Sequence, residues 1–102
     1  RSWCYIDDFV GAVLRMLETD AANGKSFNIG NPYTALTTHQ LAEKVIEING
    51  GGVVERIPMP HVPIRERVPN IDLAREILGF DPVCDMNFGL AKTLEWTAQY
   101  DH

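Results

Sequence analysis

Helical periodicity alternates with only two strand candidates along this sequence, and that order restricts the folds open to it. Apolar residues three and four positions apart predict helices over about 8–18, from residue 37 to 49, over 70–78 and over about 85–99. Residues 26–29, which alternate polar and apolar, and residues 53–57 are the strand candidates. We therefore predict a small α/β unit with about four helices and two or three short strands, too few for a dinucleotide-binding sheet.

The ends of the predicted helices carry local signals. Asp8 stands at the start of the first helix, where a carboxylate can cap free N–H groups, and we interpret it as a helix cap. Thr37 and Gln40 have the spacing of a capping box, with Thr38 as the alternative cap. Gly50 begins a run of three glycines that should end this second helix.

The periodicity also predicts which helix faces are buried. The apolar positions of the first helix and those of the last helix should face inward, and Trp96 should pack between the last helix and its neighbours. These positions are Phe9, Val10, Val13, Leu14 and Leu17 in the first helix and Leu90, Ala91, Leu94 and Ala98 in the last. Between the second and third helices, four prolines stiffen a long loop, and loops of that length are usually functional or disordered.

Composition excludes several classes of partner. The formal net charge of −5 argues against nucleic acid, whose phosphates select basic surfaces. No apolar run approaches the roughly 20 residues of a membrane span, and no secretory signal is present.

Cys4 and Cys84 lie far apart without metal-ligand spacing, so we expect free thiols in a reducing, cytoplasmic environment rather than a disulfide. Because the sequence opens at Arg1 without a methionine, we expect a piece of a longer protein.

A self-contained active site is not expected. The sequence lacks the Gly-x-Gly-x-x-Gly turn that cradles a dinucleotide, and no Tyr is followed four positions later by Lys. His39, His61 and His102 are scattered and form no metal-ligand pattern with the cysteines.

Four stretches, in order, resemble the C-terminal part of extended short-chain dehydrogenases/reductases that modify nucleotide sugars, the NAD-dependent epimerase/dehydratase family. Residues 1–8 are similar to the family's R-S-F-x-Y-V-x-D segment, and residues 27–32 resemble its x-N-I/L-G-N-P turn. Residues 67–74 are similar to R-x-P-D-I-x-x-A. Residues 78–96 resemble L-G-W-x-P followed by G-L-x-x-T-x-x-W. Each motif alone is weak, but together they span nearly the whole chain.

Within that family the chain looks most like the UDP-glucuronate decarboxylases, with UDP-glucose 4-epimerases and dTDP-glucose 4,6-dehydratases as close competitors. The resemblance implies that residues 1–102 are the substrate-binding C-terminal portion, which binds a UDP-sugar. NAD would be held by an upstream Rossmann domain in the full-length enzyme, and none by this fragment. Full-length relatives are usually homodimers, with an interface that would lie mostly upstream. In such enzymes C4 of the sugar is oxidised with the help of NAD before the 4-keto intermediate reacts further.

The resemblance also assigns roles to arginines. Arg1 matches the family arginine that reaches the nucleotide diphosphate. Arg67 matches the arginine near the sugar and its phosphate, which in the decarboxylases handles the carboxylate or donates a proton, so it is the catalytic candidate. Arg65 is a third substrate-binding candidate, although no family motif falls on it. The structural alternative for each is an ordinary solvated arginine.

One position and one segment depart from the family pattern. Asn70 replaces the usual Asp, which should affect helix capping more than chemistry, and residues 61–64 lack the acidic segment often found in decarboxylases. The alternative from another functional class is a stand-alone, non-enzymatic binding module that keeps this fold and covers an exposed apolar face with a partner.

Overall fold

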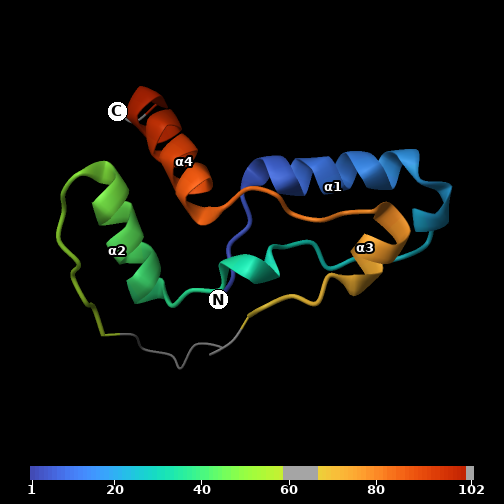
Figure 1. Cartoon of the computed structure of the whole chain (residues 1–102), viewed down its shortest axis with the longest axis horizontal. Coiled ribbons are helices and arrows are strands. Elements are labelled where there is room, and N and C mark those ends of the chain that lie inside the picture. Colours follow the sequence, from blue (N-terminus) through green and yellow to red (C-terminus); the bar gives the residue numbers. More distant parts are fainter. Residues whose placement is uncertain (59–66, 101–102) are drawn as a thin grey trace.

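The computed structural model describes residues 1–58 and 67–100, which form four α-helices and two short 3₁₀ turns. In order these are α1 (Ile6–Glu18), η1 (Asp20–Ala22), η2 (Pro32–Thr34), α2 (Thr38–Asn49), α3 (Asp72–Leu78) and α4 (Met86–Tyr100). Helices α1 and α3 pack together at one end of the molecule, and α2 and α4 pack together at the other (Figure 1). The predicted number of helices is confirmed.

The predicted strands are wrong. Neither residues 26–29 nor residues 53–57 form a strand, and the β-pairing within the described ranges is a single antiparallel bridge between Ser2 and Ala35. A strand is stabilised by the ladder it shares with a neighbour, and neither segment has such a neighbour in the part of the chain described. These residues therefore make a small helical arrangement instead of the α/β unit that the sequence predicts.

The local sequence signals predicted the start and end of α2 correctly but not the start of α1. At α2 the capping box is confirmed, because Gln40 N donates to Thr37 Oγ1 at 3.1 Å and Thr37 N donates to Gln40 Oε1 at 2.9 Å. Gly50 ends α2 in the left-handed region, with φ of 83°. The interpretation of Asp8 as a cap is wrong, since α1 already begins at Ile6 and Asp8 lies within its first turn.

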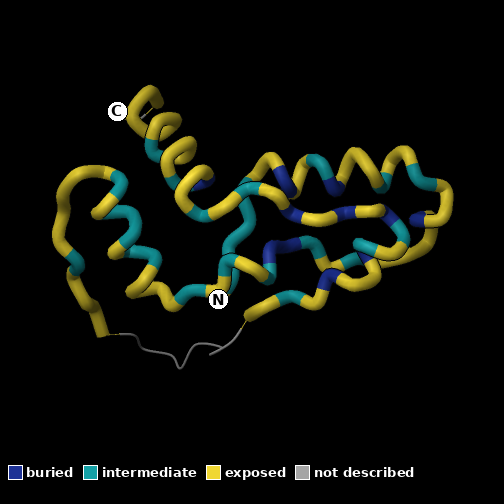
Figure 2. The backbone as a smooth tube through the Cα atoms, in the orientation of Figure 1, coloured by how far each residue is buried: buried dark blue, intermediate teal, exposed yellow. Residues whose placement is uncertain are grey.

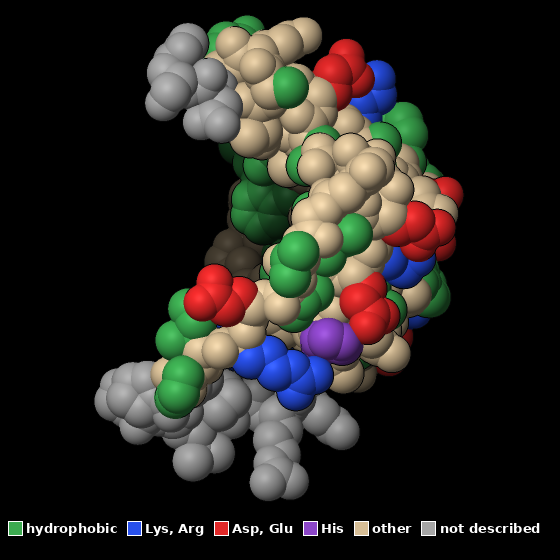
Figure 3. Space-filling view, turned by 90° about the vertical axis from the view of Figure 1, so that its left-hand side faces the viewer, with side chains coloured by type: hydrophobic (Ala, Val, Ile, Leu, Met, Phe, Trp, Pro, Cys, Tyr) green, Lys and Arg blue, Asp and Glu red, His purple; other side chains and the backbone are tan. Residues whose placement is uncertain are grey.

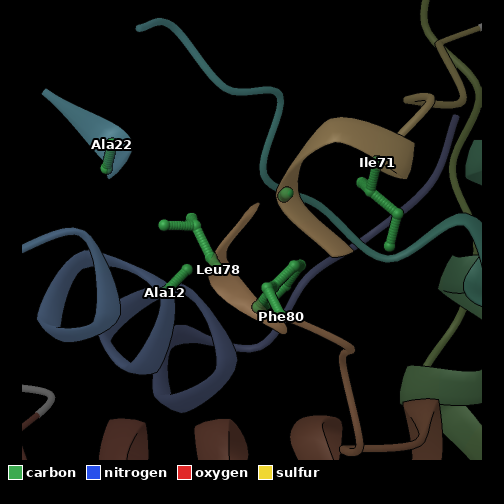
Figure 4. Packing of buried hydrophobic residues seen from close by; sticks show 6 residues of the cluster. Ala12, Ala22, Ile71, Leu78 and Phe80 are labelled. Carbon is green, nitrogen blue, oxygen red and sulfur yellow. The ribbon is translucent and has the colours of Figure 1, made fainter. Parts of the chain in front are cut away.

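A small core joins α1 to α3. Figure 4 shows Ala12 of α1 close to Leu78, with Phe80 beside them and Ile71 on the far side of α3. The described apolar residues that are buried are Ala12, Ala22, Ile71, Ala74, Leu78 and Phe80. Among them only Ile71 is both large and essentially inaccessible to solvent. The apolar side chains that surround this cluster are only partly covered.

Several helix faces predicted to be buried are exposed (Figure 2). The apolar positions of α1 are between 37% and 79% exposed, and Ala91 and Ala98 of α4 are exposed as well. Trp96 is 62% exposed and stacks on Tyr100 of its own helix, with ring centroids 5.1 Å apart, instead of packing between helices. The periodicity correctly identified the apolar positions of these helices, but the described chain leaves many of them uncovered.

None of the described helices has the length and apolar character needed to cross a membrane.

Candidate functional site

Three segments that are distant in sequence meet at Ser2. Ser2 N and Ser2 Oγ both donate to the carbonyl oxygen of Arg67, at 3.0 and 3.2 Å, across 65 positions of sequence. On the other side, Leu36 N donates to the carbonyl oxygen of Arg1 at 2.9 Å, and the terminal amine of Arg1 donates back to Leu36 O at 3.2 Å. The first two residues therefore lie between residues 34–36 and Arg67, and the backbones of the two family-matched arginines are neighbours.

A close approach at Gly30 holds the Arg67 segment against the turn that follows residues 27–29. A Cβ atom on Gly30 would lie 2.7 Å from Cγ of Pro69, closer than real Cβ contacts allow. Gly30 does not have a positive φ, so a glycine is required here by this contact and not by an unusual backbone conformation. Asn28 Nδ2 also donates to Asn70 O at 3.4 Å, which adds a second link between the same two segments.

Asn70 is not the cap of α3 that the sequence predicts, because the cap position is Ile71 and no side chain caps this helix. Asn70 lies one residue earlier, and its side-chain Oδ1 accepts a hydrogen bond from Asp72 N at 2.9 Å. An Asp side chain at position 70 would offer the same kind of acceptor.

Of the three predicted substrate-binding arginines, the structure places two. Arg1 and Arg67 are both exposed, and within residues 1–58 and 67–100 neither guanidinium has a hydrogen-bond or ion-pair partner. Arg65 and His61 lie outside the described residues. The structure thus brings the Arg1 and Arg67 segments together and places both side chains at the surface of the part of the chain that it describes.

An apolar cleft of about 510 Å³ begins two residues after Arg1. It lies between α2 and α4, and Figure 3 shows the surface hollowed at this end of the molecule, with apolar side chains in the hollow. Trp3, Tyr5, Leu41, Leu90 and Trp96 supply most of its apolar lining. The indole Nε1 of Trp3 is buried and has no hydrogen-bond partner among the described residues.

Thr34 lines this cleft and is linked by hydrogen bonds to Trp3 and Asn31, and sequence reasoning gave Thr34 no role. Trp3 N donates to Thr34 Oγ1 at 3.2 Å, and the same hydroxyl lies within donating distance of the carbonyl oxygens of Trp3 and Asn31. Asn31 is 3% exposed; its Oδ1 accepts from Tyr33 N at 2.9 Å and its Nδ2 donates to Cys84 O at 3.3 Å. The first bond is local to the turn at residues 31–34, whereas the second, across 53 positions of sequence, depends on tertiary structure.

Asp8 fastens α1 to the segment that precedes α4. Its two carboxylate oxygens accept hydrogen bonds from Val83 N at 3.2 Å and Cys84 N at 3.0 Å, and the residue is 8% exposed. Partial burial raises the pKa of the Cys4 and Cys84 thiols, and the negative charge of Asp8 raises both further. Neither thiol therefore has the lowered pKa of a catalytic nucleophile.

The described residues offer no cluster of three or more His, Cys, Asp and Glu side chains that could hold a metal ion. The arrangement does offer two arginine-bearing segments that are fixed to one another, and the first of them leads within two residues into the lining of the apolar cleft. Guanidinium groups match phosphate and carboxylate oxygens with two parallel hydrogen bonds, so the chemistry favoured here is recognition of an anion.

Comparison with known proteins gives the chain its relatives. It is 34% identical to UDP-D-apiose/UDP-D-xylose synthase 1 of Arabidopsis thaliana over 118 aligned residues, covering 100% of this chain and 29% of the relative. It is 36% identical to UDP-glucuronic acid decarboxylase 5 of the same plant over 91 residues, covering 88% of this chain and 26% of the relative. A UDP-D-apiose/UDP-D-xylose synthase of Oryza sativa subsp. japonica is 32% identical over the whole chain.

The chain thus spans between a quarter and three-tenths of the length of these relatives. No family model matches it. The resemblance to UDP-glucuronate decarboxylases that the four motifs indicate is confirmed. The chain belongs to the nucleotide-sugar enzyme family that contains the UDP-glucuronic acid decarboxylases and the UDP-D-apiose/UDP-D-xylose synthases.

Proposed function

We propose that this chain is the substrate-binding part of a longer, NAD-dependent enzyme that decarboxylates UDP-glucuronate. The observation that carries the proposal is the pair of hydrogen bonds from Ser2 to the carbonyl oxygen of Arg67, which joins the Arg1 and Arg67 segments. Both belong to motifs matched to a family whose relatives are named for UDP-glucuronic acid and UDP-pentoses. UDP-sugar epimerisation or dehydration would use the same binding groups.

The roles of the two arginines follow from the charge of such a substrate. A UDP-uronic acid carries a diphosphate and a carboxylate, and each presents a pair of oxygens that can accept two parallel hydrogen bonds from a forked guanidinium donor. In the proposal Arg1 binds the diphosphate, and Arg67 orients the sugar carboxylate and stabilises the negative charge that develops as CO₂ leaves. Arg65 would be a further substrate contact.

The Arg67 segment has the supports that a positioning role requires. Its carbonyl is held by Ser2, Pro69 lies against Gly30, and Asn70 accepts from Asn28. A cation on a fixed backbone is already oriented toward its substrate, so less conformational entropy is lost when the substrate binds.

When bound, NAD would accept a hydride from C4 of the sugar, so that the resulting β-keto acid can lose CO₂, and would then return the hydride to C4. Residues 1–58 and 67–100 contain no parallel sheet, and the sequence has no Gly-x-Gly-x-x-Gly turn, so these residues do not fit a dinucleotide. The proposal therefore places NAD on the remaining part of the longer enzyme and gives this chain only binding and orientation.

Steady-state kinetics of the full-length gene product test these roles. Arg67→Ala should lower kcat/KM for UDP-glucuronate on the order of 10²-fold or more through kcat, because it removes a donor that acts as charge develops. Arg1→Ala should raise KM about 10- to 100-fold with little change in kcat, because a diphosphate contact serves ground state and transition state alike.

Lys25→Ala is the matched control. Lys25 is exposed and follows η1 at the far end of α1, so the change removes one positive charge away from the site and should leave kcat and KM unchanged. Equal losses in all three variants would contradict the proposed roles. A gene product that binds a protein partner but no UDP-sugar would favour the non-enzymatic alternative.

A further inference from the structure

The apolar side of α1 faces away from the rest of the described chain. Successive helical residues are rotated by about 100°, so six large apolar side chains share an arc of roughly 140°. We call this set the outer face of α1; it comprises Ile6, Phe9, Val10, Val13, Leu14 and Leu17. All six are exposed, from 37% for Val13 to 79% for Leu17.

The opposite side of α1 makes the contacts with the rest of the described chain, through polar side chains and through a small apolar contribution to the core. Asp8 accepts hydrogen bonds from Val83 N and Cys84 N, and Arg15 Nη1 donates to Leu78 O at 3.1 Å. Ala12 is the one small apolar residue of α1 that is completely buried there. In Figure 2 the buried positions of α1 lie on its lower side, toward the rest of the molecule, whereas its upper side is exposed.

A helix placed at the surface of a finished domain shows the reverse arrangement, with its apolar stripe inward and its polar residues in water. Leaving six large apolar side chains about half exposed forfeits roughly half of the free energy that their full burial would contribute to folding. The orientation of α1 therefore indicates that a second apolar layer covers its outer face in the intact protein.

The size of the outer face argues against a second copy of this chain as that layer. A helix of 13 residues is roughly 20 Å long and 10 Å across, so its face offers on the order of 200 Å². Stable protein–protein interfaces need about 800 Å² from each partner, because association costs translational and rotational freedom. A segment of the same polypeptide avoids most of that cost and can dock on a much smaller face.

The proportions of the molecule point the same way. Its radius of gyration is 16.1 Å, compared with about 13 Å for a compact domain of this length. The relatives that it matches are more than three times longer, since it covers only 26–29% of them.

We propose that the outer face of α1 is an internal docking surface, covered by an apolar layer from the remaining part of the same longer polypeptide. This inference rests on the proposal that the chain is part of a longer enzyme. It goes beyond that proposal because it names the element by which the two parts are joined. The rim supports it: Asp7, Glu18 and Asp20 flank the outer face, so the covering layer should carry basic residues at its border.

Thiol protection in the full-length gene product tests the inference. Val10→Cys and Leu17→Cys each place a thiol in the outer face, and Glu76→Cys places one at an exposed position of α3 as the matched control. Alkylation is followed by peptide mass mapping, which separates the new thiols from Cys4 and Cys84. The rate in the native protein is compared with the rate after unfolding in urea.

The inference predicts that Cys at 10 and 17 reacts at least about 100-fold more slowly in the native protein than in urea, while Cys at 76 reacts at nearly equal rates. Fast native labelling at 10 and 17 would overturn it. Protection that disappears on dilution, together with a halving of the mass, would also overturn it in favour of a second copy, and so would a gene product of 11.4 kDa.

Decarboxylation of UDP-glucuronate by the same preparations separates this inference from the proposed function. Protected thiols in a protein without activity toward UDP-sugars would leave the docking surface standing and remove the substrate assignment. Reactive thiols in an active enzyme would remove the docking surface and leave the substrate assignment standing.

Discussion

Single residues in this protein join segments that sequence alone leaves far apart. Asp8 links α1 to the segment before α4, Gly30 admits Pro69, and Ser2 holds the carbonyl of Arg67. Each is small or charged, and each acts through one or two contacts with the backbone or a proline ring. The consequences of changing them can therefore be stated separately.

Asp8→Asn should lower the free energy of unfolding by about 2 kcal/mol, because the two carboxylate oxygens accept two separate backbone N–H groups. The amide would turn an NH₂ group toward one of those donors and leave it unpaired. Urea unfolding measures the change, and Asp7→Asn, at an exposed position of the same helical turn, should stay within about 0.5 kcal/mol of the original protein. Equal effects of the two substitutions would show that Asp8 has no special structural role.

Gly30→Ala should weaken binding of a UDP-sugar, because the new Cβ would displace the Pro69 ring and with it the Arg67 segment. Gly11→Ala is the matched control: a Cβ there meets nothing within 4 Å, and alanine favours the interior of α1 by up to about 1 kcal/mol. Titration calorimetry with UDP-glucuronate should find affinity lowered only by the first change. Unaltered affinity in Gly30→Ala would mean that the arginine segment does not depend on this contact.

The Cys4 and Cys84 thiols should react slowly with iodoacetamide in the folded protein, since partial burial and the Asp8 charge raise both pKa values. A thiol whose pKa is raised by folding stabilises the protein fully below the unfolded pKa, and this stabilisation is lost as pH rises through the folded pKa. Stability should therefore fall in the alkaline range above about pH 8.5. The pH dependence of alkylation, peptide by peptide, measures both values; pKa values at or below those of unfolded peptides would refute this.

At the scale of elements, α2 and α1 illustrate two kinds of helix. The boundaries of α2 are set locally, by the capping box at Thr37 and by Gly50, and both were predictable from spacing. The orientation of α1 is set by Asp8 and Arg15, whose partners lie more than 60 positions away. Periodicity could therefore show that α1 is amphipathic but could not show which side faces the described chain.

Thr37→Ala should destabilise α2 by about 1 kcal/mol, because it removes the acceptor for Gln40 N at the first turn. Hydrogen exchange should accelerate in α2 and stay unchanged in α1, which packs elsewhere. Thr38→Ala, one residue into the helix, is the control and should have a smaller effect. A larger effect from Thr38 would assign the cap to that residue, the alternative that the sequence left open.

At the scale of the whole molecule, a feature could be predicted when the residues that determine it lie close together in the sequence. Four helices and the capping box follow from residues within a few positions of one another, and they were predicted correctly. Strands at 26–29 and 53–57 were predicted wrongly because strand formation needs a partner, and the described chain supplies none. The meeting of Ser2 with Arg67 has no local signal and was visible only through motifs shared with a family.

The molecule as described has an open shape, a small core between α1 and α3, and two arginine segments fixed beside an apolar cleft. Because the described chain buries so little apolar surface, a further covering layer would add to its free energy of folding. A binding site built from exposed arginines would in turn need a neighbouring part of the enzyme that holds the cofactor. Both features agree with one part of a larger enzyme.

Release of CO₂ from UDP-glucuronate by the gene product that carries this chain tests that account most directly. We expect CO₂ and a UDP-pentose in equal amounts, from a protein several times heavier than 11.4 kDa, and loss of both products in Arg67→Ala. A gene product near 11.4 kDa that neither binds nor converts a UDP-sugar would contradict it.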